Sequence, residues 1–375
     1  MRFFPLAIVC LVATPALAFD PTGNPAADAL LKAFEDGDDR IVSVGNVNAT
    51  GDTIVVTGIE ARRDGGPDGP ATIKIGSVEV SAPNLSGDVL MADRVLIQDR
   101  SEETAAGTWS VAEEDIRDAR LAAGSLSTDA DVSQALAAYG RATASGFKAN
   151  VKPQNGSGSA TFAVETAGWL PSQRGETGTV AGELTLTGVS VESQDIPPMP
   201  VSPGPANLTL SFAYTEASGA LDLSDMTLTV PNVGELAIVA DIDGATSDNV
   251  KALTTASGIP SPGVLTGVAI GGLSVSFTDD GALNAALQNA GAGMSPDTVR
   301  AMALQGLSGA LLAIGNQQLA NEIQSAASAF LNGTAKTVTI SAAPAKPTTL
   351  AEIIGAAQRS PGALISLLNP SVSSK

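Results

Sequence analysis

The sequence predicts a mainly β protein of the α+β class. Two related antiparallel β-sheet halves of long, bent strands are expected, with a C-terminal helical segment covering a sheet face. Apolar and polar residues alternate through most of residues 41–277, as they do in strands with one buried face. One strand pattern recurs five times, and helical spacing of apolar residues dominates only from residue 282 onward.

Residues 1–18 have the plan of a cleavable secretory signal peptide. Met1-Arg2 supplies one positive charge, an apolar run follows from Phe3 to Val12, and Ala16-Leu17-Ala18 offers small residues at a cleavage site. The single cysteine, Cys10, lies inside this segment, so the mature chain is expected to lack thiols and disulfides. No later stretch reaches the roughly 20 apolar residues of a membrane span. We therefore expect an exported protein without a transmembrane anchor, either periplasmic or secreted.

The first half, residues 19–151, is predicted to hold one helix followed by strands. Residues 25–36 show helical spacing, with Leu30, Leu31 and Phe34 on one face. Alternation then predicts strands over residues 41–44, 53–61, 73–80 and 89–97. The charged stretch 111–121 is left unassigned, and residues 131–143 are predicted to be helical.

The second half, residues 159–281, follows a linker at 152–158 that is rich in Pro, Asn, Gly and Ser. Strand alternation recurs, residues 195–205 form a loop because they contain five prolines, and residues 247–256 are predicted to form a short helix. The strands of this half are expected over residues 160–164, 182–191, 208–214, 221–230, 235–242 and 264–277.

Residues 282–333 are predicted to be helical, over 283–289 and 295–331. Ser295-Pro296-Asp297 has the cap, proline and acidic residue typical of a helix start, and Gly315 is expected to end that helix. In the last part, residues 334–375, a strand at 337–341 precedes short helices at 350–357 and 363–368.

The recurring strand pattern reads apolar, x, apolar, x, small, apolar, x, apolar, and begins at Ile54, Ile73, Leu184, Leu221 and Val268. At the small residue the apolar phase slips by one, which would turn the next apolar residues to the other face unless the strand bulges there. We therefore expect bent strands that keep one apolar face. Two interpretations stay open: ordinary bends around a packed core, or a concave, apolar-lined groove.

The candidate groove is lined by the apolar residues of these strands. They are Ile54, Val56, Ile59, Ile73, Ile75, Val78, Leu184, Leu186, Val189, Leu221, Leu223 and Met226. The stretches 73–85 and 221–233 also match at one offset, with a Pro-Asn pair in each, which indicates an internal duplication or a chance recurrence of strand and turn signals.

Composition excludes several classes of function. The net charge of −19 disfavours a nucleic-acid partner. The chain has no histidine, which removes the usual general base, the histidine triads and the common zinc ligand sets. We expect no cofactor, no metal and no catalytic residue, and therefore no enzyme.

Two sets of motifs bear on this expectation. Ser145-Gly146-Phe147-Lys148, Ser247-Asp248-Asn249 and Lys336-Thr337 follow the order of motifs in serine β-lactamases, but a helix is not expected around Ser145. Asp241-x-Asp243-Gly244 and Asp279-Asp280-Gly281 lack the full calcium-loop pattern and are more typical of turns.

The strands of the type G-x-L-x-L-x-G-V-x-V, the Pro-Asn turns and the closing proline-helix tail resemble AsmA-like and related β-groove envelope proteins of Gram-negative bacteria, over about residues 40–345. The resemblance implies a periplasmic protein with a lipid-accommodating groove. This chain departs from that group because no membrane anchor is expected after cleavage, which favours soluble carriage or chaperoning over bridging between membranes.

Taken together, the sequence predicts an exported, non-enzymatic envelope protein. Its most concrete expected function is that of a soluble periplasmic binding or carrier protein for an apolar, lipid-like ligand. The alternative is a structural or protein-interaction component of the cell envelope or surface.

Overall fold

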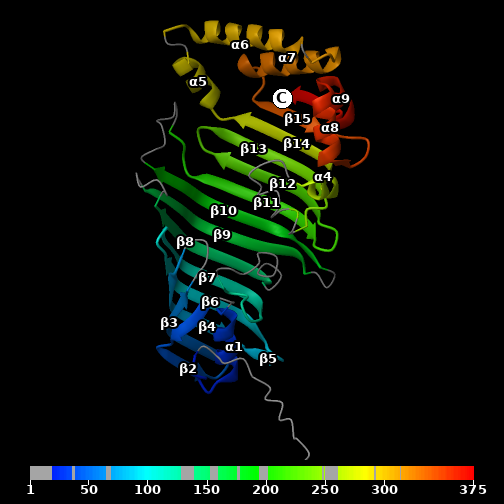
Figure 1. Cartoon of the computed structure of the whole chain (residues 1–375). Helices are drawn as coiled ribbons and strands as arrows, with labels where there is room; N and C mark the ends of the chain where they lie inside the picture. Colours follow the sequence, from blue (N-terminus) through cyan, green and yellow to red (C-terminus); the bar gives the residue numbers. More distant parts are fainter. Residues whose placement is uncertain are drawn as a thin grey trace, which may run out of the picture.

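The computed structural model describes residues 19–35, 39–64, 69–127, 139–152, 159–174, 178–193, 202–246, 249, 261–290, 293–312 and 314–375. These residues form one open antiparallel sheet of 17 strands, with helices at its two ends (Figure 1). Several predicted segments lie outside the described residues: the signal peptide 1–18, residues 131–138 of the predicted helix 131–143, residues 153–158 of the predicted linker 152–158, residues 195–201 of the predicted loop 195–205, and all of the predicted helix 247–256 except Asn249.

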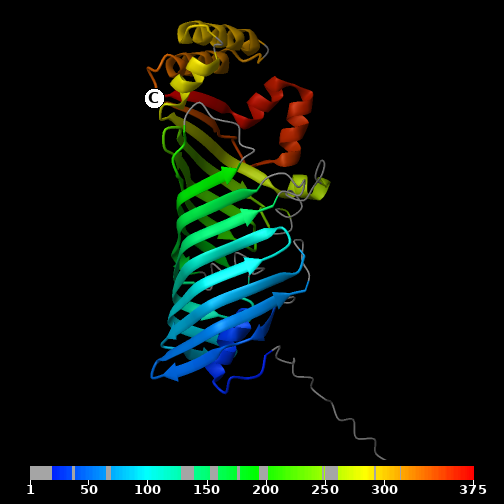
Figure 2. The same ribbon diagram turned by 90° about the vertical axis from the view of Figure 1, so that its left-hand side faces the viewer.

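The strands follow one another through the sheet almost in chain order, as the successive colours of Figure 2 show. The first eight are β1 (Asp39–Ser43), β2 (Asn46–Thr50), β3 (Thr53–Arg63), β4 (Ala71–Ser81), β5 (Asn84–Ser86), β6 (Val89–Glu103), β7 (Gly107–Leu121) and β8 (Arg141–Val151). The others are β9 (Ala160–Arg174), β10 (Thr179–Ser193), β11 (Ala206–Thr215), β12 (Ala220–Val230), β13 (Gly234–Asp243), β14 (Ala269–Asp279), β15 (Thr337–Ala342), β16 (Thr348–Thr349) and β17 (Pro370–Ser374).

The two predicted halves share this single sheet, because β8 pairs directly with β9 along most of its length. Pairing runs from β3 through β4 and β6 to β15 and β17. Strands β1 and β2 both pair with β3, β5 pairs with β6, and β16 pairs with β14. The longest strands have 15 residues, which corresponds to a sheet width of ~50 Å.

Predicted bends are present, and in β3, β4 and β6–β10 they align in one line across the sheet. Thr57 pairs with Ser77 and Ile59 with Ile75, which leaves Gly58 opposite Gly76. The same unpaired position continues through every neighbouring strand to β10. We call this line the crease; it consists of Gly58, Gly76, Asp99, Ala112, Gly146, Glu165 and Gly188.

Every second residue of the crease has a positive φ: 65° at Gly58, 54° at Asp99, 68° at Gly146 and 66° at Gly188. In all these strands the alternation of side chains between the two faces of the sheet therefore shifts by one residue at the crease. As a result, the apolar residues on both sides of the crease lie on the same face. In the second recurring unit the distortion falls at Gly76, one residue before the predicted Ser77. In the fourth unit the register shifts between Leu223 and Met226; Asp225 pairs with Ser211, so the unpaired residue is Ser224, one residue before the predicted Asp225.

The packed core lies at the end of the sheet that begins with β1. Helix α1 (Pro25–Ala33) is capped by Asn24, whose side chain accepts hydrogen bonds from the backbone N–H groups of Ala26 and Ala27. Its Leu30 and Leu31 are fully buried against the apolar side of the first strands. The helix contacts β6 and β7. The helix predicted over residues 25–36 is therefore present, and it ends at Ala33.

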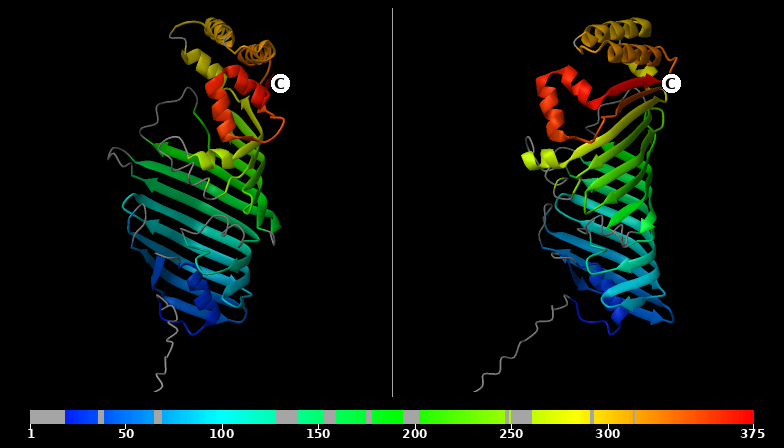
Figure 3. Two further views of the ribbon diagram at one scale, coloured as in Figure 1. Left: turned by 45° about the vertical axis from the view of Figure 1, so that its right-hand side comes forward. Right: turned by 90° about the vertical axis from the view of Figure 1, so that its right-hand side faces the viewer.

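The remaining helices lie at the other end of the sheet, as Figure 3 shows. They are α4 (Pro262–Gly267), α5 (Ala282–Ala290), α6 (Pro296–Leu311), α7 (Gln317–Leu331), α8 (Leu350–Arg359) and α9 (Pro361–Leu368). Helices α6 and α7 form a hairpin, and α7 packs on β15 and β17. The ring of Phe330 on α7 meets that of Phe277 on β14 at 6.2 Å.

Most predicted elements are confirmed, with two corrections. Residues 264–267 belong to helix α4, not to a strand, because Pro262 and the Ser261 cap begin a short helix before β14. Residues 141–143, predicted as the end of a helix, begin strand β8, where pairing with β7 and β9 satisfies their backbone groups. The unassigned stretch 111–121 falls within β7. Among the described helices, none has both the length and the apolar composition that a membrane span requires.

Candidate functional site

Apolar residues form one continuous row across the sheet, at right angles to the strands. Each member is the direct cross-strand partner of the next, from β3 to β17. With neighbouring strands about 4.8 Å apart, the row is ~58 Å long. We call it the apolar row; it consists of Ile54, Val80, Val95, Ile116, Ala142, Trp169, Leu184, Leu210, Met226, Ile238, Val275, Ile340 and Val372.

Burial changes along the apolar row. Val80, Val95 and Ile116 are at most 2% exposed beneath α1. From Leu184 to Val275 the side chains are only half-buried, and Ile340 is 55% exposed. The row therefore begins in a packed core and continues onto a surface that is partly accessible to solvent.

The elements that pack over the apolar row also differ along its length. Helix α1 contacts β6 and β7, and α7 contacts β15 and β17, whereas the extensive contacts of β9–β13 among the described residues are with neighbouring strands. We call the apolar side of β9–β13 the open face. Several parallel rows widen it, for example Leu186, Leu208, Leu228 and Leu236, which are paired in that order. At its margin Val191 is 54% exposed.

Aromatic rings lie on this side of the sheet on both sides of the crease. Trp169 and Phe212 meet at 5.7 Å, while Phe147 lies 6.3 Å from Trp109 and 5.9 Å from Phe162. Rings in such offset or edge contacts form flat, apolar surfaces. Both tryptophans of the chain thus lie on the apolar side, and Trp169 is 4% exposed.

The opposite side of the sheet is polar and carries small hydroxyl residues. Cross-strand hydroxyl pairs join Thr166 to Thr187 at 2.7 Å and Ser276 to Thr339 at 2.8 Å. Thr209 and Thr227 are paired neighbours on this side, next in sequence to Leu210 and Met226 on the open face. The sheet is therefore amphipathic along its length, as alternation requires.

A cluster of buried charges closes the core end of the apolar side. Arg63 Nε donates to Asp39 at 2.8 Å, and Arg63 Nη1 donates to Glu102 at 3.2 Å. Trp109 Nε1 donates to the second oxygen of Glu102 at 3.1 Å. All of these carboxylate contacts are to opposite charges or to N–H and O–H donors, which is what buried ions require. The cluster ties β1, β3, β6 and β7 together and leaves no acid or base facing solvent.

Arg100 extends the cluster toward α1. Its guanidinium lies 5.9 Å from the ring of Phe34 and 5.6 Å from that of Trp109, and it donates to the carbonyl of Leu126 at 2.8 Å. Nearby, Tyr139 donates to the carbonyl of Ser125 at 3.1 Å, and burial raises the pKa of Tyr139 to about 12. Sequence reasoning missed this cluster, because charged residues scattered over 39–114 give no local pattern.

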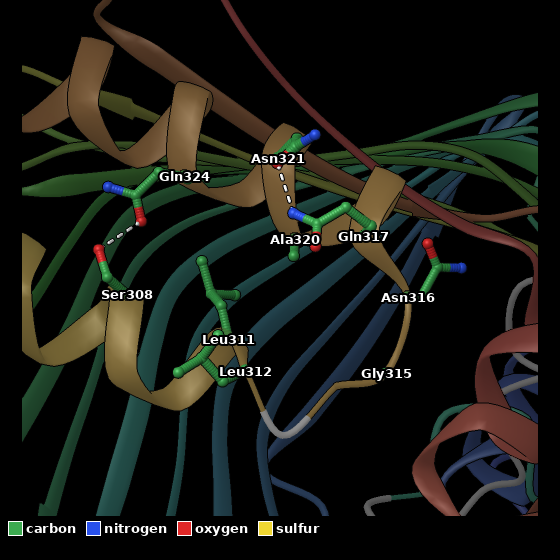
Figure 4. A pocket seen from close by; sticks show the side chains of 9 residues that line it. All are labelled: Ser308, Leu311, Leu312, Gly315, Asn316, Gln317, Ala320, Asn321 and Gln324. Atoms are coloured by element: carbon green, nitrogen blue, oxygen red, sulfur yellow. Dashed lines mark hydrogen bonds between the residues drawn. The ribbon is translucent and has the colours of Figure 1, made fainter.

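A cleft lies between α6 and α7, where Leu311 and Leu312 face the amide side chains of α7 (Figure 4). Its volume is about 480 Å³. Ser308 donates to Gln324 at 3.1 Å across it, and Gln317 donates to Asn321 at 2.9 Å. The cleft has no charged lining residue, so it lacks the groups needed for acid–base chemistry.

The predicted groove residues divide into two groups. Ile54, Val56, Ile59, Ile73, Ile75 and Val78 are 0–5% exposed and lie in the packed core. Leu184, Leu186, Val189, Leu221, Leu223 and Met226 are half-buried on the open face. The structure thus brings the second group together with Leu208, Leu210 and Phe212 of β11 and with residues of β13. The sequences of β11 and β13 alternate simply and lack the recurring pattern, so the sequence did not predict their residues to line the groove.

Residues of the β-lactamase-like and calcium-loop-like motifs lie on a strand or accept hydrogen bonds from backbone N–H groups. Ser145 and Lys148 lie on strand β8, not on a helix. Asp279 accepts a hydrogen bond from the N–H of Leu283 at 2.8 Å at the start of α5, and Asp280 accepts one from the N–H of Asn232 at 3.1 Å. Within the described part of the chain, no three acidic side chains gather closely enough to hold a metal ion.

Comparison with known proteins adds one finding. Residues 227–375 match a protein-family model described as "Uncharacterized protein". The matched region runs from β12 to β17 and includes α4–α9, so it covers the end of the open face together with the helices beyond it. A search of the curated proteins finds none that matches this chain.

Proposed function

We propose that this protein is an exported, non-enzymatic binding or carrier protein for an elongated apolar ligand, such as a lipid acyl chain. The ligand lies along the apolar row on the open face. The observation that supports this most strongly is the change in burial within one continuous row, from fully buried beneath α1 to half-buried over β10–β13.

The physical reason is the free energy of covering apolar surface. Each Å² of apolar surface removed from water contributes ~25 cal/mol, and a row of half-buried Leu, Met and Ile side chains gains that contribution when a ligand covers it. The gain needs no directional contacts, so a flexible chain of methylene groups suits the face. The paired hydroxyls of the opposite side provide no such surface.

The pattern-level resemblance to AsmA-like and related β-groove envelope proteins supports the same ligand class. The signal-peptide plan of residues 1–18 supports action in the periplasm or outside the cell. The matching stretches 73–85 and 221–233 lie on β4 and β12, and we propose that an ancestral duplication lengthened the sheet and with it the apolar row.

The direct test is the lipid content of the protein purified from its native host, measured by mass spectrometry after organic extraction. Leu210→Asp places a charge on the open face, whereas Thr209→Asp places the same charge on the opposite side of the same strand. We expect lipid with the wild-type protein and with Thr209→Asp, and at least a tenfold loss with Leu210→Asp, since a buried carboxylate opposes an apolar ligand. Wild-type protein without lipid, or equal lipid in both variants, would contradict the proposal.

A further inference from the structure

Strand β17 forms the last edge of the sheet, because β15 is the one described strand with which it pairs. At the end of this pair, Lys375 and Thr337 exchange two backbone hydrogen bonds of 3.0 Å. Bonded and non-bonded pairs alternate in an antiparallel ladder, so Val372 and Ile340 form a non-bonded pair. The N–H of Val372 therefore points away from β15, toward the side on which a further strand would add.

The side chain of Glu322, on helix α7, occupies this outward N–H. Its Oε2 accepts a hydrogen bond from the N–H of Val372 at 3.3 Å, and its Oε1 accepts one from Nε2 of Gln318 at 3.1 Å. Two residues earlier in the strand, Pro370 stands at the preceding outward position and has no N–H. Two successive outward positions of β17 thus offer no unoccupied donor to another strand.

Glu322 has an unusual place for a glutamate on a surface helix. It is the one charged residue among the 15 residues of α7, and its carboxylate is turned toward the sheet. It adjoins the buried side of the helix, where Leu319 is 7% and Ala326 is 3% exposed. Charged residues normally stand on the solvent side, where α7 instead carries the exposed Asn321 and Ser325. Helix α7 packs on β17 and lies beyond it at this end of the molecule (Figure 2).

We propose that Glu322 guards this edge against strand addition, and that the strand it excludes is β17 of a second copy of the chain. Unpaired backbone groups at a sheet edge pair readily with another chain, and natural sheets prevent this with proline, inward-pointing charges or a covering helix. All three protections meet at β17. An incoming strand would have to displace the carboxylate from Val372 and find it another partner, which opposes pairing.

A second copy suits this edge because antiparallel pairing of β17 with itself is symmetric about a two-fold axis. The apolar row ends at Val372, while the neighbouring Ser371 and Ser373 are exposed on the hydroxyl side. Pairing two identical strands about such an axis places apolar residues beside apolar ones and serines beside serines. The apolar rows of the two copies would then join into one. This inference goes beyond the proposed function, because it concerns assembly of the chain and needs no ligand.

The test is sedimentation velocity of the full mature chain over a range of protein concentrations, without added ligand. Glu322→Ala uncovers the N–H of Val372 and keeps a residue that favours a helix, so we expect at least a tenfold rise in the association constant. Glu183→Ala removes the same charge from an exposed position on β10 and should behave like the wild type. In Glu322→Ala/Val372→Pro the outward donor is gone while the bonds to β15 are kept, and association should return to the wild-type level.

Hydrogen–deuterium exchange at low protein concentration tests the contact itself. We expect the amide of Val372 to exchange at least tenfold faster in Glu322→Ala than in the wild type. The amide of Ser373 belongs to a bonded pair with Thr339 and should exchange at the same rate in both proteins, which also verifies that β17 stays in the sheet.

Three outcomes would overturn the proposal. In the first, Glu322→Ala associates no more than the wild type although its Val372 amide exchanges faster. In the second, Glu322→Ala and Glu322→Ala/Val372→Pro associate equally, which would place the contact elsewhere. In the third, the Ser373 amide loses its protection together with that of Val372, which would show that Glu322 holds β17 in the sheet and does not guard its edge.

Discussion

At the scale of single residues, the crease depends on backbone conformations that few residue types adopt. Gly146 has φ 68°, and a Cβ there would lie 2.9 Å from the Cβ of Ala112 on the neighbouring strand. Positive φ costs a non-glycine residue ~1–2 kcal/mol before any crowding is counted. Glycine at this position is therefore a structural requirement for turning the apolar residues on both sides of the crease to one face.

This requirement gives the first prediction. Gly146→Ala should lower the free energy of unfolding by ~1–3 kcal/mol, through positive φ and contact with Ala112, measured by urea denaturation. The control is Gly263→Ala in the first turn of α4, where no positive φ is imposed and nothing lies within 4 Å of the added Cβ. Equal stability of Gly146→Ala and Gly263→Ala would show that the crease does not constrain the backbone.

Residue-level prediction from the sequence succeeded where the signal was local. The slip of apolar phase at Gly58 and Gly188 predicted a distortion at both positions, and both have positive φ. The contributions of Asp99, Ala112 and Glu165 were not predictable, because they belong to the crease only through their position opposite a neighbouring strand. The same reason hid the pairing of Arg63 with Asp39 and Glu102, which join distant parts of the chain.

At the scale of elements, α1 and the open face carry the same kinds of apolar side chain but bury them to different extents. Leu31 of α1 is fully buried in the core, whereas Leu210 of β11 is half-buried on the open face. If the core at the α1 end holds the fold together, the two leucines must differ in what they contribute to stability.

The second prediction follows from this difference. Leu31→Ala should lower the free energy of unfolding by ~2–5 kcal/mol, as truncation of a core leucine does. Leu210→Ala, measured on ligand-free protein by the same denaturation experiment, should cost less than half as much because its side chain already contacts water. A cost for Leu210→Ala as large as that for Leu31→Ala would indicate that the open face is part of a packed core.

Helix boundaries were predictable where capping residues mark them. Ser295 accepts the N–H of Thr298 and begins α6, as its sequence indicated. Thr349 and Glu352 form a capping box at the start of α8. Helix α4 was missed because Val264 and Leu265 continue the apolar spacing of the strand that follows, so alternation outweighed the Ser261-Pro262 start signal.

At the scale of the whole molecule, a sheet of this length has its apolar side covered by described helices only near its ends. Alternation predicted that each strand has an apolar side, but the number of strands in one sheet depends on pairing between strands, which local sequence does not specify. The linker at 152–158 suggested two halves, yet β8 and β9 on either side of it pair directly. The continuous apolar row is a property of that pairing.

The most direct test of the account is quenching of Trp169 fluorescence by a fatty acid carrying bromine on its acyl chain. Trp169 belongs to the apolar row next to Leu184, and Trp109→Phe leaves it as the only tryptophan of the chain. In this background we expect saturable quenching that Leu210→Asp weakens at least tenfold and Thr209→Asp leaves unchanged. Absence of saturable quenching, or quenching that the two variants affect equally, would contradict the assignment of the open face as the ligand site.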